Sequence, residues 1–342
     1  MNNKMMNKSF SVVMLTVLAT AGLVLADDVQ VTGAGATFPN PIYSKWFQEF
    51  RSVRKDAQVN YQSLGSSAGI KQLTAGTVDF GASDVPMTED QIKAMKIRAL
   101  HVPTVLGAVV AIYNIPGYSK DLKLSGENLA DIYLGKIKSW GDKALAAENP
   151  GLPDKPIIIV RRSDGSGTSF IFTDYLSKIS PEWKAKAGSA ASVAWPVAGL
   201  GGKGSEGVTG LVMGTPYSVG YVEAIYALQN KLGSAMMKNK SGAFIKVELA
   251  GVTAAAAGAA KSMPADFRVS IVDAPGKDAY PISSFTWLLI PTKFEDAKKR
   301  DVMVQFLKWM VKDGQKYAPA LGFAPLPQEV AAKVEAAIAQ VK

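Results

Sequence analysis

One stretch of this chain, in which an apolar run passes directly into a polar turn and a helix-like segment, constrains the fold more than any other. Residues 157–160 (IIIV) are apolar, residues 161–168 (RRSDGSGT) combine arginines with hydroxyl side chains and glycines, and residues 169–173 are helix-like. This order predicts a buried strand that leads through a turn into the start of a helix. The free N–H groups at a helix start, together with an arginine, are suited to bind an oxyanion.

Similar strand and helix signals alternate along most of the chain. The expected strands are residues 29–31, 58–62, 78–84, 102–115, 157–160 and 285–290, and the expected helices are residues 42–51, 70–75, 169–173, 252–261, 302–310 and a last helix that begins near residue 327. Strands that alternate with helices predict parallel sheets covered by helices, in which ligands lie at the carboxyl ends of the strands. The glycine-rich residues 199–205 (GLGGKGS) are predicted to form a mobile loop.

The N-terminus has the pattern of a secretory signal peptide. Lys4 and Lys8 precede an apolar stretch over residues 11–25, which is followed by Ala26, a small residue suited to cleavage. We therefore expect residues 1–26 to be removed by cleavage after Ala26. The chain has no cysteine, so it can form no disulfide and lacks the residue at which a bacterial lipoprotein is anchored. The mature chain exceeds the ~250–300 residues that one core usually supports, which predicts two lobes.

The composition disfavours several classes of function. The formal net charge is +9, but no long basic run is present, so nucleic-acid binding is disfavoured, although a mildly positive surface would attract anions. His101 is the only histidine and cysteine is absent, which argues against a zinc site and against a serine–histidine–aspartate triad. We predict a protein that is not an enzyme and that uses no metal and no cofactor.

Three of the predicted strand-to-helix turns have the same chemistry. Residues 37–38 (TF), 66–67 (SS) and 166–168 (SGT) each offer free N–H donors with hydroxyl or small side chains. A single turn of this kind is in most cases only a helix cap. Three of them in one chain, together with Arg162 and Asp84, indicate an anion-binding site.

Asp84 is unexpected in an anion site, because a carboxylate repels an anion. A carboxylate can only accept hydrogen bonds, so it favours a ligand that still carries a proton. Hydrogen phosphate has such a proton at neutral pH, whereas sulfate would place its own acceptor against that of Asp84. Arg162 can pair with the ligand and offset the negative charge. In the alternative interpretation, Asp84 only caps a helix and Arg162 lies on the surface.

Four separated motifs resemble those of the periplasmic phosphate-binding proteins of the PstS family, the substrate-binding components of the high-affinity phosphate ABC importer. They are residues 32–39 (TGAGATFP), 65–69 (GSSAG), 78–84 (VDFGASD) and 161–170 (RRSDGSGTSF). The resemblance covers nearly the whole chain after residue 26, but residues 232–277 do not match the family.

The resemblance implies an α/β protein with the type II periplasmic-binding-protein fold, in which two lobes with mixed or parallel sheets flanked by helices close around an anion. Lobe I would comprise residues 27–103 and 282–342, and lobe II residues 104–281. The implied phosphate ligands are Thr37, Phe38, Ser66, Asp84, Arg162, Ser166, Gly167 and Thr168, with Asp164 orienting Arg162. A monomeric periplasmic protein would deliver the phosphate to an inner-membrane ABC permease.

Three other functions remain as alternatives. The protein could bind another oxyanion, such as sulfate or molybdate, which the carboxylate of Asp84 disfavours. It could be an exported phosphatase, which would need a nucleophile with a base or a metal cluster. It could also be a secreted surface or adhesion protein that keeps the fold, and loss of phosphate binding would favour that function.

Overall fold

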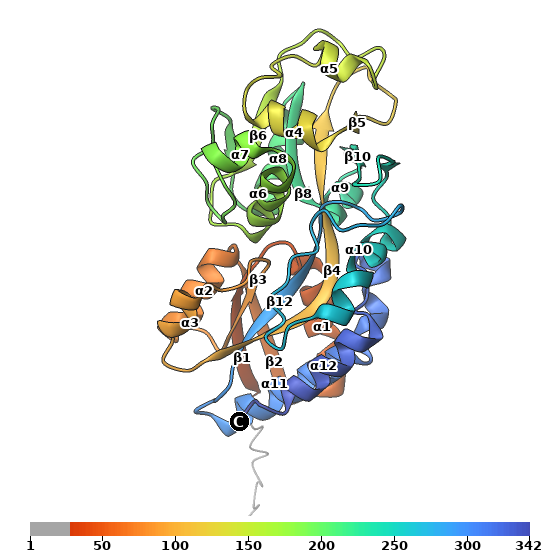
Figure 1. Ribbon diagram of the computed structural model, residues 1–342. Coiled ribbons are helices and arrows are strands. Elements are labelled where there is room, and N and C mark those ends of the chain that lie inside the picture. Colours follow the sequence, from red (N-terminus) through yellow and green to blue (C-terminus); the bar gives the residue numbers. More distant parts are fainter. Residues whose placement is uncertain (1–27) are drawn as a thin grey trace, which may run out of the picture.

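The computed structural model describes residues 28–342, and the predicted signal peptide lies outside the described residues. Figure 1 shows two lobes, one above the other, with the long strand β4 (Ala99–Asn114) running from one into the other. Strands and helices alternate through both lobes. The predicted two-lobe α/β architecture is therefore confirmed.

Lobe I, the lower lobe in Figure 1, is built from both ends of the described chain. Its elements besides β4 are β1 (Val29–Gly35), α1 (Asn40–Val53), β2 (Ala57–Ser63), α2 (Ser66–Ala75), β3 (Phe80–Ser83), α3 (Glu89–Lys93), β12 (Ser283–Pro291), α11 (Ala297–Val311), α12 (Gln328–Ile338) and the short 3₁₀ helices η1 (Gly314–Tyr317) and η2 (Pro319–Leu321).

Lobe II, the upper lobe, contains the middle of the chain. Its elements are β5 (Lys123–Leu124), α4 (Gly126–Tyr133), α5 (Lys143–Ala146), β6 (Ile158–Arg162), α6 (Gly167–Ile179), α7 (Pro181–Lys186), β7 (Leu200–Gly202), α8 (Gly204–Gly214), β8 (Ser218–Glu223), α9 (Ala224–Gln229), β9 (Gly233–Ser234), β10 (Met236–Lys238) and β11 (Phe244–Ile245). The helix α10 (Leu249–Ser262) packs against β4 and β12, beside the junction of the lobes (Figure 1).

The strands of both lobes join in one mixed sheet. Its order is β2-β1-β3-β12-β4-β8-β6-β7, with β9 also paired to β4. The pairs β1–β2, β1–β3, β6–β7 and β6–β8 are parallel, as predicted, whereas β12 and β4 run antiparallel to their neighbours. The strand β4 pairs with β12 as far as Ala108 and with β8 from Val109 onward, so one continuous strand links the two lobes.

The predicted amphipathic helices form because their apolar residues recur on one face. In α1, Ile42, Trp46 and Phe50 are all buried, at the four-residue spacing that places side chains on one side of a helix. In α12, Val330 and Val334 are buried in the same way. These helices cover the sheet of lobe I and fix the positions of the strand ends that lead to the other lobe.

Residues 199–205 do not form the predicted loop, so that prediction was wrong. Residues 200–202 form β7, which pairs in parallel with β6, and α8 begins directly after Lys203. A Cβ on Gly202 would lie 2.5 Å from the backbone nitrogen of Val208, and Gly204 has a left-handed φ of 69°. The glycines therefore allow a close strand–helix approach and a tight turn rather than mobility.

Residues 232–277, which matched no family motif, form short strands of lobe II and the helix α10 beside the lobe junction. The short strand β10 pairs in parallel with β5 and antiparallel with β11, in a separate three-stranded sheet. The alanine-rich helix predicted over residues 252–261 is confirmed within α10. The segment after α10 returns to the junction of the lobes, where Arg268 contacts the segment that follows β3.

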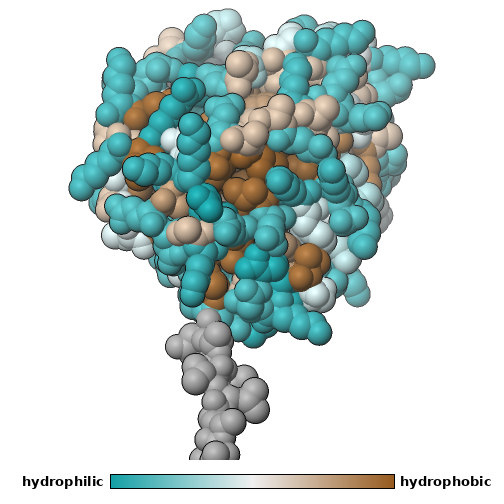
Figure 2. Space-filling view, turned by 90° about the horizontal axis from the view of Figure 1, so that it is seen from below, coloured by the Kyte–Doolittle hydropathy of each residue, from teal (hydrophilic) through white to brown (hydrophobic). Residues whose placement is uncertain are grey.

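Figure 2 shows the molecule from below, where hydrophilic side chains surround recessed hydrophobic ones over most of the visible face. The side chains of Phe306 and Met310 on α11 are fully buried, whereas Trp309 is partly buried. Within residues 28–342, no helix combines the length and the apolar character that crossing a bilayer requires.

Candidate functional site

Two helix starts from different lobes face each other, and they are the first part of the site. The Ser66 hydroxyl at the start of α2 accepts a hydrogen bond from the backbone N–H of Gly167 at the start of α6, at 3.1 Å. Next to it, the N–H of Ser67 donates to the carbonyl of Gly165, also at 3.1 Å. A Cβ on Gly167 would lie 2.5 Å from the Ser66 Oγ, so only glycine allows this approach.

Asp84 lies at the carboxyl end of β3 and is 1% exposed. Its Oδ1 accepts from the Thr286 hydroxyl at 2.7 Å, and its Oδ2 lies 3.4 Å from the Ser66 Oγ. Burial raises the pKa of Asp84 to about 7, although the Thr286 hydrogen bond and the charge of Arg162 oppose the shift. Among the described residues, this buried carboxyl group has no direct cationic partner.

Arg162 ends β6 and is 3% exposed, so the surface interpretation of this residue was wrong. Its Nε and Nη2 donate to the two carboxylate oxygens of Asp164, at 2.8 and 2.5 Å. Burial alone would raise the pKa of Asp164, but the hydrogen bonds and charge of Arg162 outweigh it and the pKa is lowered. The bidentate pair fixes the plane of the guanidinium and leaves Nη1 directed to lobe I.

Thr37, in the turn between β1 and α1, receives that Nη1. The distance from Arg162 Nη1 to Thr37 Oγ1 is 3.2 Å. The same threonine oxygen lies 2.9 Å from the Ser205 hydroxyl and accepts from the Ser205 N–H at 3.3 Å. The Thr37 carbonyl accepts from the Tyr226 hydroxyl at 2.6 Å. Thr37 is thus in contact with three separate elements of lobe II.

The remaining predicted residues lie beside these groups. The Phe38 ring is fully buried and packs near Phe323, at 6.2 Å between ring centroids. The Ser166 hydroxyl caps α6 by accepting from the Ser169 N–H at 3.1 Å. Thr168 Oγ1 is buried and has no hydrogen-bond partner among the described residues. A buried hydroxyl without a partner costs about 1–3 kcal/mol, which a ligand oxygen would offset.

The sequence-predicted residues therefore gather where the two lobes meet. All of those with polar side chains are buried, apart from the partly exposed Asp164, and they lie on the turns after β1, β3 and β6 or at the starts of α2 and α6. The arrangement combines one carboxyl group with a guanidinium, several hydroxyls and backbone N–H groups of a helix start. Such a set can surround a tetrahedral oxyanion with donors and offer one acceptor to a protonated oxygen.

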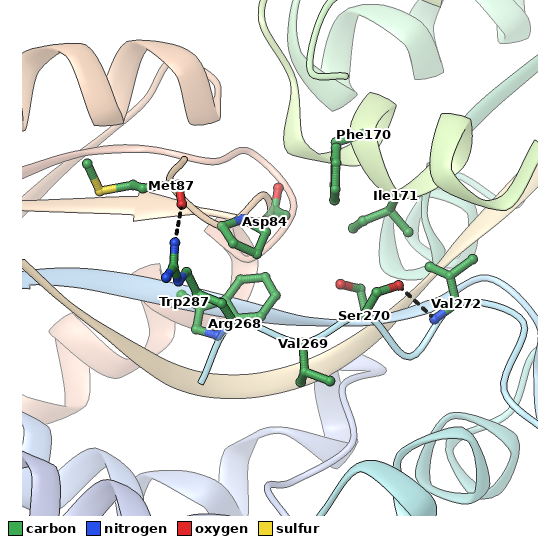
Figure 3. Close-up of a pocket in the computed structure, with 11 residues that line it drawn as sticks. Asp84, Met87, Phe170, Ile171, Arg268, Val269, Ser270, Val272 and Trp287 are labelled. Atoms are coloured by element: carbon green, nitrogen blue, oxygen red, sulfur yellow. Dashed lines mark hydrogen bonds between the residues drawn. The ribbon is translucent and has the colours of Figure 1, made fainter. Parts of the chain in front are cut away.

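A crevice between the lobes leads to this site (Figure 3). It has a volume of about 190 Å³ and is lined on one side by Phe170 and Ile171 of α6 and on the other by Trp287 and Asp84. Arg268 lies at its edge and donates to the carbonyl of Met87 at 3.0 Å. The lining is largely apolar away from Asp84, so the crevice itself offers few groups to a small anion.

Sequence reasoning did not identify Ser205, Tyr226 or Thr286 as parts of this region. Thr286 is the one polar residue in the run of residues 285–290 (FTWLLI), and a polar residue in such a run is a signal that could have been followed. Ser205 was assigned to a loop together with the glycines before it. Tyr226 lies in a short helix with no pattern that points to a contact with the other lobe.

The described residues contain no group of three or more histidine, cysteine, aspartate or glutamate side chains that could hold a metal ion. Buried His101 accepts from the N–H of Met87 through Nε2 at 3.0 Å, and burial lowers its pKa to about 4. It therefore acts as a neutral acceptor within lobe I. Its hydrogen bond serves the packing of β4 against the segment after β3.

The fold and this site define a class of binding protein, and comparison with known proteins agrees. A family model for the PBP superfamily domain matches residues 25–314. The phosphate-binding protein PstS of Pasteurella multocida is 44% identical over 309 residues, which are 90% of this chain and 89% of that protein. The phosphate-binding protein PstS of Xylella fastidiosa is 42% identical over 311 residues, 90% of this chain and 84% of that protein. The chain belongs to the family of the PstS phosphate-binding proteins.

A solved structure shows the same fold. The structure of a high affinity periplasmic phosphate-binding protein bound with phosphate has a TM-score of 0.74. It is 21% identical in sequence, and the match covers 90% of this chain and 93% of that chain. The two-lobe arrangement described above is therefore that of the type II periplasmic-binding-protein fold.

Proposed function

We propose that the protein binds inorganic phosphate, as hydrogen phosphate, in the periplasm and delivers it to an ABC transporter permease in the inner membrane. The observation that carries this proposal is the buried carboxyl of Asp84 among donors from both lobes, including Arg162. An acceptor surrounded by donors matches an anion that still has one proton, and sulfate does not meet that condition. The names of the curated relatives, phosphate-binding protein PstS, agree with this chemistry.

We assign the roles as follows. Asp84 accepts the phosphate proton, Arg162 binds the anion through Nη1, and Asp164 holds the guanidinium in place. The other ligands donate from backbone N–H groups or hydroxyls, and they are Thr37, Phe38, Ser66, Ser166, Gly167 and Thr168. Support for this set comes from the burial of its polar side chains and from the unpartnered hydroxyl of Thr168.

Lobe closure around the anion is part of the proposal. We divide the chain into lobe I, residues 27–103 and 282–342, and lobe II, residues 104–281. In an open form, phosphate would meet the groups of one lobe first, and rotation about the crossing strands would then complete its shell. The exchange of partners along β4, from β12 to β8, supports a hinge in this part of the chain.

The proposal also concerns the processing, the oligomeric state and the lack of catalysis of the protein. We propose that residues 1–26 are a signal peptide cleaved after Ala26 and that the mature protein is a monomer without enzymatic activity. The absence of cysteine supports a protein that is not a lipoprotein. Sequencing the N-terminus of protein isolated from the periplasm should give Asp27 as the first residue, and a chain that still begins at Met1 would contradict it.

Isothermal titration of the phosphate-stripped mature protein tests the binding function. Tight one-to-one binding of phosphate is the expected result, with far weaker binding of sulfate at pH 9, where the Asp84 carboxyl is ionised. Equal affinity for sulfate would retain an oxyanion-binding protein but contradict the role of Asp84. Absence of phosphate binding would contradict the proposal and favour a surface protein that keeps the fold.

A further inference from the structure

Ser205 and Tyr226 approach Thr37 from two different elements of lobe II. Ser205 is the second residue of α8, is fully buried, and lies 168 positions from Thr37 in the sequence. Tyr226 lies on α9 and donates to the Thr37 carbonyl at 2.6 Å. Neither residue belongs to the proposed phosphate ligands, yet both contact the turn of lobe I that carries two of them.

The hydrogen-bonding capacity of the Thr37 hydroxyl shows what Ser205 does. A hydroxyl has one proton to donate and two lone pairs that accept. The Arg162 Nη1 and the Ser205 N–H both donate to Thr37 Oγ1, at 3.2 and 3.3 Å, and so use the two lone pairs. The Thr37 proton is then left to donate, and the Ser205 Oγ at 2.9 Å is an acceptor for it.

Tyr226 differs from Ser205 because a second acceptor lies beside it. The Tyr226 hydroxyl is 3.2 Å from Glu206 Oε1, which belongs to α8 of the same lobe. One phenol proton can serve only one of the two acceptors at a time. When the lobes separate, Tyr226 can donate to Glu206 instead of the Thr37 carbonyl, so the loss of its interlobe bond is partly compensated.

We propose that Ser205 is a positioning residue for Thr37 and a closure contact outside the phosphate shell, with Tyr226 in a smaller role. The inference rests on the proposed function, since it concerns how long a bound phosphate is retained. The Ser205 Oγ accepts the one Thr37 hydroxyl proton, so Thr37 donates to phosphate through its backbone N–H. This contact connects lobe II to Thr37 only when the lobes are together. Loss of the Ser205 hydroxyl therefore destabilises the closed form and leaves the first encounter with phosphate unchanged.

The test compares phosphate binding by wild type, Ser205→Ala, Tyr226→Phe and a control, Thr209→Val. Thr209 is also buried on α8, but its hydroxyl donates only to the carbonyl of Ser205 within the helix. Dissociation is measured by chasing radiolabelled phosphate with an excess of unlabelled phosphate, and association by rapid mixing. We expect Ser205→Ala to raise the dissociation rate constant about tenfold and Tyr226→Phe about threefold, with association within about twofold of wild type. Thr209→Val should leave both rate constants within about twofold.

A double-mutant cycle with Thr37→Val separates a specific contact from general loosening. If Ser205 acts through the Thr37 hydroxyl, Ser205→Ala should have less than a twofold effect on dissociation in the Thr37→Val background. Two results would overturn the inference but not the proposed function, provided that wild type binds phosphate. One is a full tenfold effect of Ser205→Ala in the Thr37→Val background, and the other is an unchanged dissociation rate constant in Ser205→Ala alone. Absence of phosphate binding by wild type would instead overturn the proposed function and this inference together.

Discussion

The turns that follow β3 and β6 each place an aspartate in the same site, yet the two carboxyl groups have opposite character. Asp164, after β6, receives two hydrogen bonds from Arg162 and one from the N–H of Gly204 at 3.0 Å, and its pKa is lowered. Asp84, after β3, receives hydroxyl contacts only, and burial raises its pKa to about 7. The hydrogen-bonding and charged partners of each carboxyl group, rather than its residue type, decide whether its pKa is raised or lowered.

The difference assigns the two aspartates to different tasks. Asp164 is satisfied by the protein itself, so it balances the charge of Arg162 and fixes the direction of the guanidinium. The carboxyl oxygens of Asp84 accept fewer and weaker hydrogen bonds, so a ligand that donates a proton to them stabilises this group most. Under the proposed function, Asp164 acts on the anion indirectly through Arg162, whereas Asp84 meets the anion directly and decides which anion is bound.

Arg162→Ala should have the largest effect on phosphate affinity, because Arg162 influences both Asp164 and Asp84. The substitution removes the partner of Asp164 and the nearby positive charge that opposes the pKa shift of Asp84. Truncating one partner of a buried charge pair costs roughly 2–5 kcal/mol, so phosphate affinity should fall about a hundredfold or more. Isothermal titration measures the change.

Arg161→Ala is the matched control for this substitution. Arg161 is the neighbouring residue of the same strand, but its guanidinium lies over the Trp195 ring, 6.0 Å from the ring centroid, and has no contact with Asp164 in the described structure. Its phosphate affinity should stay within about threefold of wild type. Equal losses in the two variants would show that general charge, rather than the Arg162–Asp164 pair, determines binding.

Asp84→Asn should have the second largest effect and should change selectivity. An asparagine keeps the shape and can still accept from the Thr286 hydroxyl, but its amide group also donates hydrogen bonds. Phosphate affinity should fall about 10- to 100-fold, because an imperfectly matched buried group costs about 1–3 kcal/mol. Sulfate affinity at pH 9, where the wild-type carboxyl is ionised, should rise above that of wild type. Titration with both anions measures this, and unchanged affinities for both would show that Asp84 does not face the ligand.

The parts of the site that lie within one local segment could be predicted from the sequence. Arg162, Asp164 and the small residues after them lie within one strand–turn–helix segment, where apolar runs and glycine spacing are visible in the sequence. Asp84 could be placed because it directly follows a strand-like run. The architecture could be predicted for the same reason, since alternating local signals define βαβ units.

The contacts between distant segments could not be predicted from local patterns. Thr286 contacts Asp84 from 202 positions away, and the antiparallel insertion of β12 between β3 and β4 that makes this contact leaves no trace in any local motif. The glycines near residue 200 have weak preferences for strand or helix, so pairing with β6 and packing against Val208 decided their structure. Ser205 was missed as a consequence of that error.

The pH dependence of sulfate binding tests the protonation state of Asp84. With a pKa near 7, Asp84 keeps its proton below that pH and can donate to sulfate, whereas above it the carboxylate repels sulfate. Sulfate affinity of wild type should therefore rise by up to about tenfold per pH unit as the pH falls from 9 to 7, and level off below. His101, with its pKa lowered to about 4, does not titrate in this range.

Asp84→Asn is the control for the pH experiment, because the variant has no carboxyl group at this position. Its sulfate affinity should be nearly constant between pH 6 and 9. A wild-type sulfate affinity that is flat or that rises with pH would contradict the assigned role of Asp84. A pH dependence that persists in Asp84→Asn would assign the titration to another group.

Asp164→Asn should have the smallest effect and should leave selectivity intact. An asparagine oxygen can still accept one hydrogen bond from Arg162, but the second oxygen and the charge that balance the guanidinium are lost. Asp164 is 14% exposed, so water can partly compensate, and phosphate affinity should fall only about three- to tenfold. Sulfate should bind as weakly as it does to wild type at pH 9, because Asp84 is unchanged. Titration with both anions distinguishes the two aspartates, and sulfate binding by Asp164→Asn would show that both carboxyl groups, rather than Asp84 alone, select the anion.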